Sequence, residues 1–234
     1  MTMIEQWIRK FEQYHQSHEL DDKSHDISHF RRVYTTAKAI MNKLGGNELV
    51  IATACYFHDI VNLPKNHPNR KQSSVLAAKE TLNILSTHYP DFPTELYPSV
   101  EHAICAHSFS ANIKPETIEA KIVQDADRVE ALGAIGLARV FYTAGLLGHH
   151  LFDAQDLFAE KRQLDDTKYA LDHFQQKLLT LPATMQTAEG RKMAEYNANY
   201  LVEFMAKLAC EVKGDPYGKA PEVIERFSSE EMAN

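Results

Sequence analysis

A histidine and an aspartate, His58 and Asp59, stand side by side at the end of an apolar run from Leu49 to Phe57. The run is apolar nearly all round, which is typical of a buried helix rather than a surface helix. Burying an imidazole beside a carboxylate is costly unless a partner satisfies both groups, and a metal ion can do so. The doublet therefore raises the question of whether the chain carries further metal ligands.

Further residues of this kind lie on both sides of the doublet. His29 lies upstream, in the segment 24–33, and Asp127 lies downstream, in the segment 124–132. Both segments have the apolar spacing of helices. A lone histidine-aspartate pair says little, whereas the ordered set of His29, His58-Asp59 and Asp127 is a specific pattern. The sequence therefore predicts a metal site made of these four residues.

Two imidazoles and two carboxylates form a mixed nitrogen and oxygen site. This donor set suits one divalent ion of Mn, Fe, Co, Ni or Zn, and it suits Mg less well because Mg²⁺ prefers oxygen ligands and keeps its waters. Four protein ligands leave an octahedral ion two positions, one for water and one for an oxygen of a ligand. Such an ion lowers the pKa of its water and neutralises negative charge on the group bound beside it. Asp59 would be both a metal ligand and a neighbour of that water.

The order of these ligands resembles the signature of the HD superfamily of metal-dependent phosphohydrolases. The resemblance runs from about residue 21 to residue 208, and the chain is similar to the small stand-alone bacterial HD proteins of the YedJ-like group. It implies an all-α helical bundle with the metal site between helices. The resemblance also implies hydrolysis of a phosphate mono- or diester. We expect this ester to be a nucleotide or a small phosphorylated metabolite. The resemblance does not supply the substrate.

Candidate substrate-binding residues follow the doublet and recur further along the chain. Lys65 and Arg70 lie in the segment 62–71, whose prolines and polar residues predict a loop beside the site. Extra cations are useful there because two carboxylates cancel the charge of the ion. In some HD proteins a histidine near His107 touches the substrate phosphate or holds a second metal. We therefore predict substrate binding by Lys65, Arg70 and His107, with His107 also protonating the leaving oxygen.

Two other functions stay open at this point. One is a non-catalytic HD module that binds a metal or another ligand. The other is a di-iron HD-type oxygenase, for which His25, His102 and His107 are the only obvious extra ligands. The chain departs from the alarmone-hydrolase subgroup, because residues 60–62 are Ile-Val-Asn and no acidic Glu-Asp pair follows the doublet. This departure argues against guanosine tetraphosphate as substrate.

The elements that must position these residues are all expected to be helices. At about 100° per residue, His29 falls about 80° from the centre of its apolar stripe, at the margin of the core. His15 and His18 are expected to be exposed. The expected parts are residues 1–22 as an N-terminal helix and connection, 23–213 as the HD domain with a helical extension, and 214–234 as a tail with a short helix. Helices are predicted over residues 4–14, 24–44, 48–61, 73–85, 96–109, 115–132, 133–147, 167–181, 187–212 and 221–227.

Composition narrows the classes of partner. The chain has 234 residues, of which 44% are hydrophobic and 24% charged, and its net charge is -7. No broad basic field is available for a nucleic acid polymer. No stretch approaches the ~18 apolar residues of a membrane span, and Cys55, Cys105 and Cys210 read as buried thiols in a reducing compartment. We expect a cytoplasmic protein with a small phosphorylated substrate, and homo-oligomer formation stays open.

Overall fold

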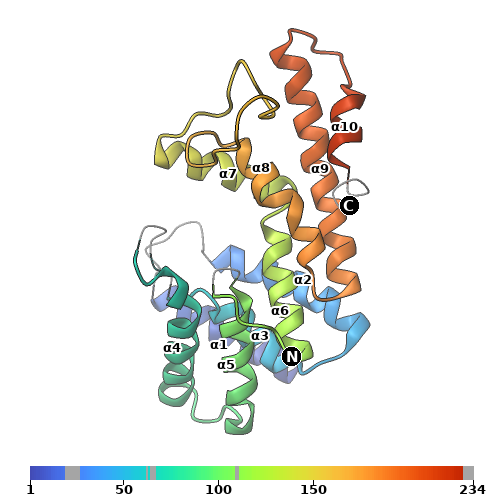
Figure 1. Cartoon of the computed structure of the whole chain (residues 1–234). Coiled ribbons are helices and arrows are strands. Elements are labelled where there is room, and N and C mark those ends of the chain that lie inside the picture. The colour runs from blue at the N-terminus through green and yellow to red at the C-terminus, as the bar shows by residue number, and fades with distance from the viewer. Residues whose placement is uncertain (19–26, 62, 64–66, 109–110, 229–234) are drawn as a thin grey trace. The chain divides into compact units, whose positions relative to one another are not determined.

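The structure is a computed structural model that describes residues 1–18, 27–61, 63, 67–108 and 111–228 (Figure 1). Every regular element in these residues is a helix, apart from one isolated parallel bridge between His150 and Tyr169. The all-α prediction is therefore confirmed. The helices are α1 (Met3–Ser17), α2 (Ile27–Leu44), α3 (Glu48–Phe57), η2 (Arg70–Gln72), α4 (Ser73–His88), η3 (Thr94–Leu96), α5 (Tyr97–His107), α6 (Ile118–Glu130), α7 (Gly133–Leu147), α8 (Asp172–Gln176), η4 (Leu178–Thr184), α9 (Ala188–Val212) and α10 (Pro221–Phe227).

The chain divides into two compact units, Met1–Asp127 and Arg128–Asn234, and the division falls inside α6. All four predicted metal ligands belong to the first unit. Each unit has its own buried helices and is described separately below. The predicted division into residues 1–22, 23–213 and 214–234 stays a prediction.

Helix α3 is the central helix of the first unit. Asn47 caps its first turn by accepting hydrogen bonds from the amides of Leu49 and Val50. Every side chain from Val50 to Phe57 is buried, as the continuous apolar run predicts. Helices α1, α2 and α5 pack against α3, while α4 and α5 lie side by side (Figure 1). The predicted helix 48–61 is too long, however, because α3 ends at Phe57 and leaves the doublet in the turn that follows.

Helix α1 docks on α3 through buried aromatic residues. Its start is fixed by Thr2, which accepts from the Glu5 amide while the Glu5 carboxylate accepts from the Thr2 amide. The Phe11 ring meets the Phe57 ring edge-on at a centroid distance of 5.1 Å. The amphipathic helix predicted over residues 4–14 is confirmed. The expected exposure of His15 is wrong, because His15 continues the buried row of Trp7 and Phe11 at steps of one helical turn.

Helix α9, with 25 residues, is the core element of the second unit. Thr187 caps it by accepting from the Gly190 amide at 2.9 Å, and α7, α10 and η4 pack against it. The predicted helices 133–147 and 221–227 are confirmed with those bounds, and 187–212 begins one residue later than predicted. A side chain at Gly136 would overlap the Ala131 carbonyl, so glycine allows α7 to start so close to the end of α6.

The helix predicted over residues 167–181 is wrong. The structure has a short α8 followed by the 3-10 helix η4, which contains Pro182. The fully buried Asp172 accepts from Arg162 at 2.8 Å and from the Asp165 amide at 2.8 Å. These bonds hold the chain before Asp172 in a loop, and Pro182 has no amide hydrogen to continue an α-helix.

The expected burial of the cysteines and the expected lack of a membrane span can both be compared with the structure of the described residues. Cys55 and Cys210 are buried, but Cys105 is only half-buried, because it shares a face of α5 with the exposed Glu101 one turn earlier. Within the described ranges no single helix is long and apolar enough to cross a membrane. One bent pair, Ile118–Glu130 with Gly133–Leu147, reaches that length and composition together.

Candidate metal centre

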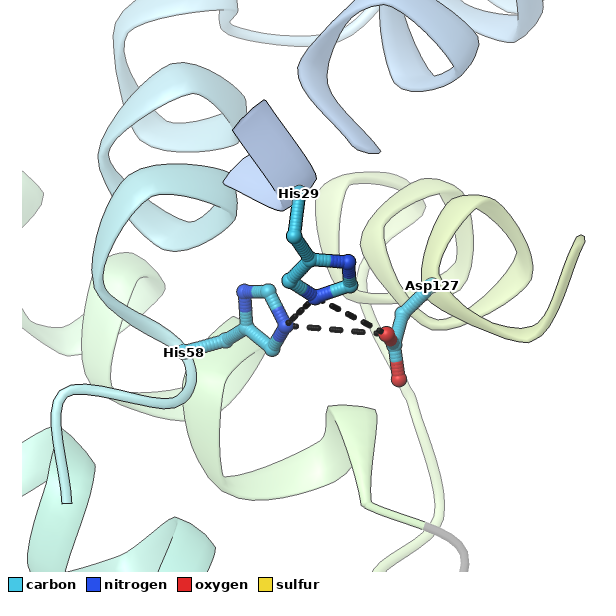
Figure 2. Close-up of side chains that lie close together, drawn as sticks. All are labelled: His29, His58 and Asp127. Atoms are coloured by element: carbon cyan, nitrogen blue, oxygen red, sulfur yellow. Dashed lines mark hydrogen bonds and ion pairs between the residues drawn. The ribbon is translucent and has the colours of Figure 1, made fainter. Parts of the chain in front are cut away.

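Three predicted ligands from three separate segments converge in the first unit. His29 lies on α2, His58 lies in the turn after α3, and Asp127 lies on α6; Figure 2 shows the two rings and the carboxylate pointing toward one another. His29 and His58 are fully buried, and Asp127 keeps about a quarter of its side chain exposed. The prediction that His29 sits at the margin of the core is wrong, because α2 buries this residue completely.

The distances among these side chains are short. The Nε2 atoms of His29 and His58 lie 3.2 Å apart. Oδ1 of Asp127 lies 3.8 Å from Nε2 of His29 and 3.6 Å from Nε2 of His58 (Figure 2). These three residues form a group that could hold a metal ion.

Asp59 and His107 lie on the other side of His58. Oδ2 of Asp59 is 3.6 Å from Nε2 of His58, and Oδ1 of Asp59 is 3.5 Å from Nε2 of His107. His58, Asp59 and His107 therefore form a second group of metal-ligating side chains, which shares His58 with the first. The structure thus brings together all four predicted ligands and the predicted acid-base residue His107.

Backbone carbonyls fix which nitrogen of two of these histidines faces the site. Nδ1 of His58 donates to the Cys55 carbonyl at 2.9 Å, and Nδ1 of His107 donates to the Ile104 carbonyl at 2.6 Å. A carbonyl can only accept, so each Nδ1 carries a proton, and in the neutral imidazole each Nε2 keeps its lone pair. Hydrogen bonding by the other ring nitrogen is the usual way to orient a metal-ligating histidine.

The end of α3 explains the position of the doublet. The last carbonyls of a helix need partners from outside its own ladder. The Ala54 carbonyl accepts from the His58 amide, the Phe57 carbonyl accepts from the Ile60 amide, and the Cys55 carbonyl accepts from the His58 ring. The Tyr56 carbonyl accepts from Nε2 of His15 at 2.7 Å. Side chains thus take the places that further helical amides would occupy, which is why the helix predicted to reach residue 61 stops at Phe57.

Helix α5 ends in the same manner, at His107. Ser74 of α4 donates to the Cys105 carbonyl at 3.0 Å, and Gln124 of α6 donates to the Ala106 carbonyl at 2.6 Å. Sequence reasoning missed His15, Ser74 and Gln124 as supports of the site. The spacing of Trp7, Phe11 and His15 was the available signal for His15, because it places a histidine on an apolar face.

The charges of the site attract a cation. Burial disfavours a charged imidazole at His58, but the carboxylates of Asp59 and Asp127 outweigh it and raise the pKa of His58 to about 9. Burial likewise opposes a charged Asp127, but the hydrogen bond and charge of His58 hold the pKa of Asp127 well below its usual range. The carboxylates of Asp59 and Asp127 therefore favour a positive charge at His58. The proton on the His58 ring supplies this charge when no metal is bound.

The geometry fits a divalent ion. Ligand atoms bound at about 2.1 Å to one octahedral ion lie about 3.0 Å apart when adjacent and about 4.2 Å apart when opposite. The separations of 3.2, 3.6 and 3.8 Å among His29, His58 and Asp127 lie between these values. Imidazole nitrogens and carboxylate oxygens also suit a divalent transition metal. One ion contacting His29, His58 and Asp127 fits these separations, whereas Asp59 groups with His58 and His107, so its part in the four-ligand set stays a prediction.

The remaining predicted site residues either bond to groups that are not metal ligands or fall outside the described residues. Lys65 and His25 lie outside the described residues. Arg70, half-buried in η2, donates to the Leu63 carbonyl at 2.5 Å and so helps to shape the chain after the doublet. His102 accepts from the Glu116 amide at 2.9 Å, which gives it a structural partner. Substrate binding by Lys65, Arg70 and His107 stays a prediction.

The fold and the site define a class of protein. The family model for the HD domain matches residues 26–132, which contain all four predicted ligands. Uncharacterized protein YpgQ of Bacillus subtilis (strain 168) is 32% identical over 198 residues, covering 83% of this chain and 87% of the relative. The chain belongs to the HD domain family, whose members bind divalent metal ions.

Solved structures agree with this assignment over nearly the whole chain. The crystal structure of Bacillus subtilis YpgQ in complex with ADP is 31% identical, with a TM-score of 0.67, and covers 88% of this chain and 98% of that chain. An HD-superfamily hydrolase from Bacillus thuringiensis is 30% identical, with a TM-score of 0.68, and covers 89% and 98%. The Lin1889 protein from Listeria innocua is 30% identical, with a TM-score of 0.67, and covers 91% and 98%.

Proposed function

We propose that this protein is a metal-dependent phosphohydrolase. The observation that carries the proposal is the convergence on Nε2 of His58, which lies 3.2 Å from His29 and 3.6 Å from both Asp59 and Asp127. Nδ1 of His58 is committed to the Cys55 carbonyl, so Nε2 is the nitrogen available to a metal. A divalent ion held by such nitrogen and oxygen ligands can activate a water for hydrolysis.

The proposed substrate is a nucleotide. Support comes from the relative YpgQ of Bacillus subtilis, whose crystal structure holds ADP and which is similar to this chain over 88% of its length. A nucleotide hydrolase also agrees with the net charge of -7, because a small substrate needs only local positive charge. A small phosphorylated metabolite is the wider class in which the nucleotide falls.

Each residue of the site has a proposed task. His29, His58, Asp59 and Asp127 would hold a divalent ion, which supplies a water of lowered pKa and neutralises charge on the phosphoryl group. Asp59 also lies beside His107, with its Oδ1 3.5 Å from Nε2 of that ring, so it would stabilise His107 when the ring is protonated. His107 keeps its proton on Nδ1 against the Ile104 carbonyl, so Nε2 is the atom that can accept or deliver a proton at the reacting phosphate.

The two alternatives make different demands on these residues. A di-iron oxygenase needs ligands for a second ion, and among the described residues the second group adds only Asp59 and His107 to the shared His58. His102 is already bonded to the Glu116 amide. A binding module needs the metal centre but no acid-base residue, so the His107–Asp59 pair favours an enzyme over it.

The proposal is tested by metal content and phosphate release. The purified protein is analysed for bound metal and then screened with nucleoside mono-, di- and triphosphates in the presence of Mn²⁺, Ni²⁺, Mg²⁺ or Fe²⁺. We expect one ion per chain and phosphate or pyrophosphate release that is lost in His58→Ala. His88→Ala, which removes an exposed histidine of α4, is the matched control and should keep both properties.

Other outcomes of this experiment would overturn the proposal. Two irons per chain without hydrolysis would favour the oxygenase. One tightly held ion without turnover of any phosphate ester would favour the binding module. Equal metal content and equal activity in the His58→Ala variant would remove His58 from the site.

A further inference from the structure

The buried residue His15 touches the supports of both metal-site histidines from a helix outside the matched family region. His15 lies on α1, whereas the HD family model begins at residue 26. Its Nε2 lies 2.7 Å from the Tyr56 carbonyl, two residues before His58. Its ring packs against the Phe30 ring at 4.8 Å and the Phe57 ring at 5.1 Å. Phe30 follows His29 in sequence, and Phe57 precedes His58.

The protonation of His15 follows from its contacts. Because a carbonyl only accepts, Nε2 carries the proton and donates it to Tyr56. Nδ1 is buried and has no hydrogen-bond partner among the described side chains and backbone groups. Burial lowers the pKa of His15 to about 4, so the ring is neutral near pH 7. His15 therefore contributes one hydrogen bond and a flat packing surface, and no charge.

That hydrogen bond lies in the last turn of α3, immediately before His58 and Asp59. If the His15 donor were lost, the buried Tyr56 carbonyl would lack a partner, and a buried unpaired carbonyl is costly. The turn could relieve this cost by turning Tyr56 toward another donor, which would move His58 because the two lie in the same turn. The ring of His15 also packs against Phe30 of α2 and Phe57 of α3, so its size influences how these two helices pack.

We propose that His15 is a positioning residue for the metal centre. Its bond to the Tyr56 carbonyl and its ring contacts with Phe30 and Phe57 hold His29 and His58 at the separation that one ion requires. The inference rests on the metal centre of the proposed function. It makes α1 a part of the site's support, in addition to the helices that carry the ligands.

The test compares two amide side chains that differ in reach. His15→Gln can bring an amide donor to the position of Nε2, whereas His15→Asn is one bond shorter and cannot reach the Tyr56 carbonyl. Mn²⁺ affinity is measured by calorimetry, and ligand geometry is followed by the visible absorption spectrum of the Co²⁺ form. Amide exchange at Ile60, whose amide donates to the Phe57 carbonyl, reports on the turn without any metal.

We expect His15→Asn to lower Mn²⁺ affinity about tenfold, at the low end of the range for residues that support metal ligands. Its Co²⁺ spectrum should change and Ile60 exchange should accelerate, while His15→Gln stays close to the wild type. Should His15→Asn fail to fold, His15→Phe keeps the ring without the donor and is judged by the same measurements. Wild-type affinity and an unchanged spectrum in the donor-free variant would overturn the inference.

A control separates positioning from general stability. Trp7 lies on the same face of α1 and packs on Phe92 at 5.2 Å, away from the doublet. Trp7→Leu should lower the melting temperature without changing Mn²⁺ affinity or the Co²⁺ spectrum. An equal loss of affinity in Trp7→Leu would mean that His15 acts only by stabilising α1, which contradicts the inference. A wild-type protein that binds neither Mn²⁺ nor Co²⁺ would instead contradict the proposed function itself.

Discussion

The Nε2 atoms of His29 and His58 lie 3.2 Å apart although the two residues are separated by 29 positions in the chain. Both rings are fully buried. Nδ1 of His58 is held by the Cys55 carbonyl, so the ring cannot turn away from its neighbour without breaking a buried hydrogen bond. Either a hydrogen bond between the two rings or a metal ion bound by both nitrogens can satisfy this close approach.

Replacing Asp127 by asparagine should weaken metal binding while keeping the fold. Asp127→Asn keeps the size of the side chain but removes the negative charge that lies 3.6 Å from Nε2 of His58. We expect metal retention to fall at least about tenfold. Replacing a residue that only supports a metal ligand already costs about that much affinity, and replacing the ligand itself should cost no less. Metal analysis after dialysis measures the loss, and the far-ultraviolet signal should stay helical. Asp91→Asn, at an exposed carboxylate, is the control; full metal retention in Asp127→Asn would remove this residue from the ligand set.

The stability of the metal-free protein should fall as pH rises from about 6.5 to about 9. The pKa of His58 is raised to about 9 in the folded protein, against about 6.5 for an unperturbed histidine. The folded state therefore binds more protons in this interval, and the stabilisation is fully present below pH 6.5 and lost as pH rises through 9. The change is on the order of 3 kcal/mol. Urea unfolding in a chelator measures it.

A bound ion should abolish this alkaline loss, because it takes the place of the proton. Saturation with Mn²⁺ should flatten the free energy of unfolding between pH 6.5 and 9, and binding near pH 7 should release about one proton. Calorimetry in buffers of different ionisation enthalpy counts that proton. If metal-free His58→Gln protein shows the same alkaline slope as the wild type, another group is responsible for it.

Removing a buried aromatic side chain beside the doublet should cost stability. Phe57→Ala should lower the free energy of unfolding by about 3–5 kcal/mol, because Phe57 is fully buried against Phe11 and His15. Leu49→Ala, at the start of the same helix, should cost less because Leu49 is only half-buried. Denaturant unfolding compares the two variants. Equal losses would contradict the packing described for α3.

Replacing His107 should change the pH dependence of phosphate release. Nε2 of His107 lies 3.5 Å from Asp59 and is the proposed proton donor or acceptor at the substrate. His107→Ala should lower kcat by about 10²–10⁴-fold, the usual contribution of acid-base catalysis. Its pH profile should also lose one limb. A profile of unchanged shape would leave His107 as a binding or structural residue.

The sequence alone predicted the four candidate ligands and most of the helices. The order of His29, His58-Asp59 and Asp127 is visible without coordinates because it consists of residue types and their order along the chain. The apolar run before the doublet predicted a buried helix, and the helices predicted over residues 133–147, 187–212 and 221–227 match α7, α9 and α10 to within one residue. These features are local, since helical periodicity and capping depend on residues within a few positions of one another.

Only the tertiary structure decided where α3 ends and which side chains support the site. At the end of α3 the Tyr56 carbonyl accepts from His15, which is 41 residues away in the chain. The meeting of His107 with Asp59 depends on the packing of α5 against α3. A sequence pattern gives the face of a helix on which a residue lies. It does not give the distance to a side chain on another helix, because that distance is set by how the buried rings between them pack.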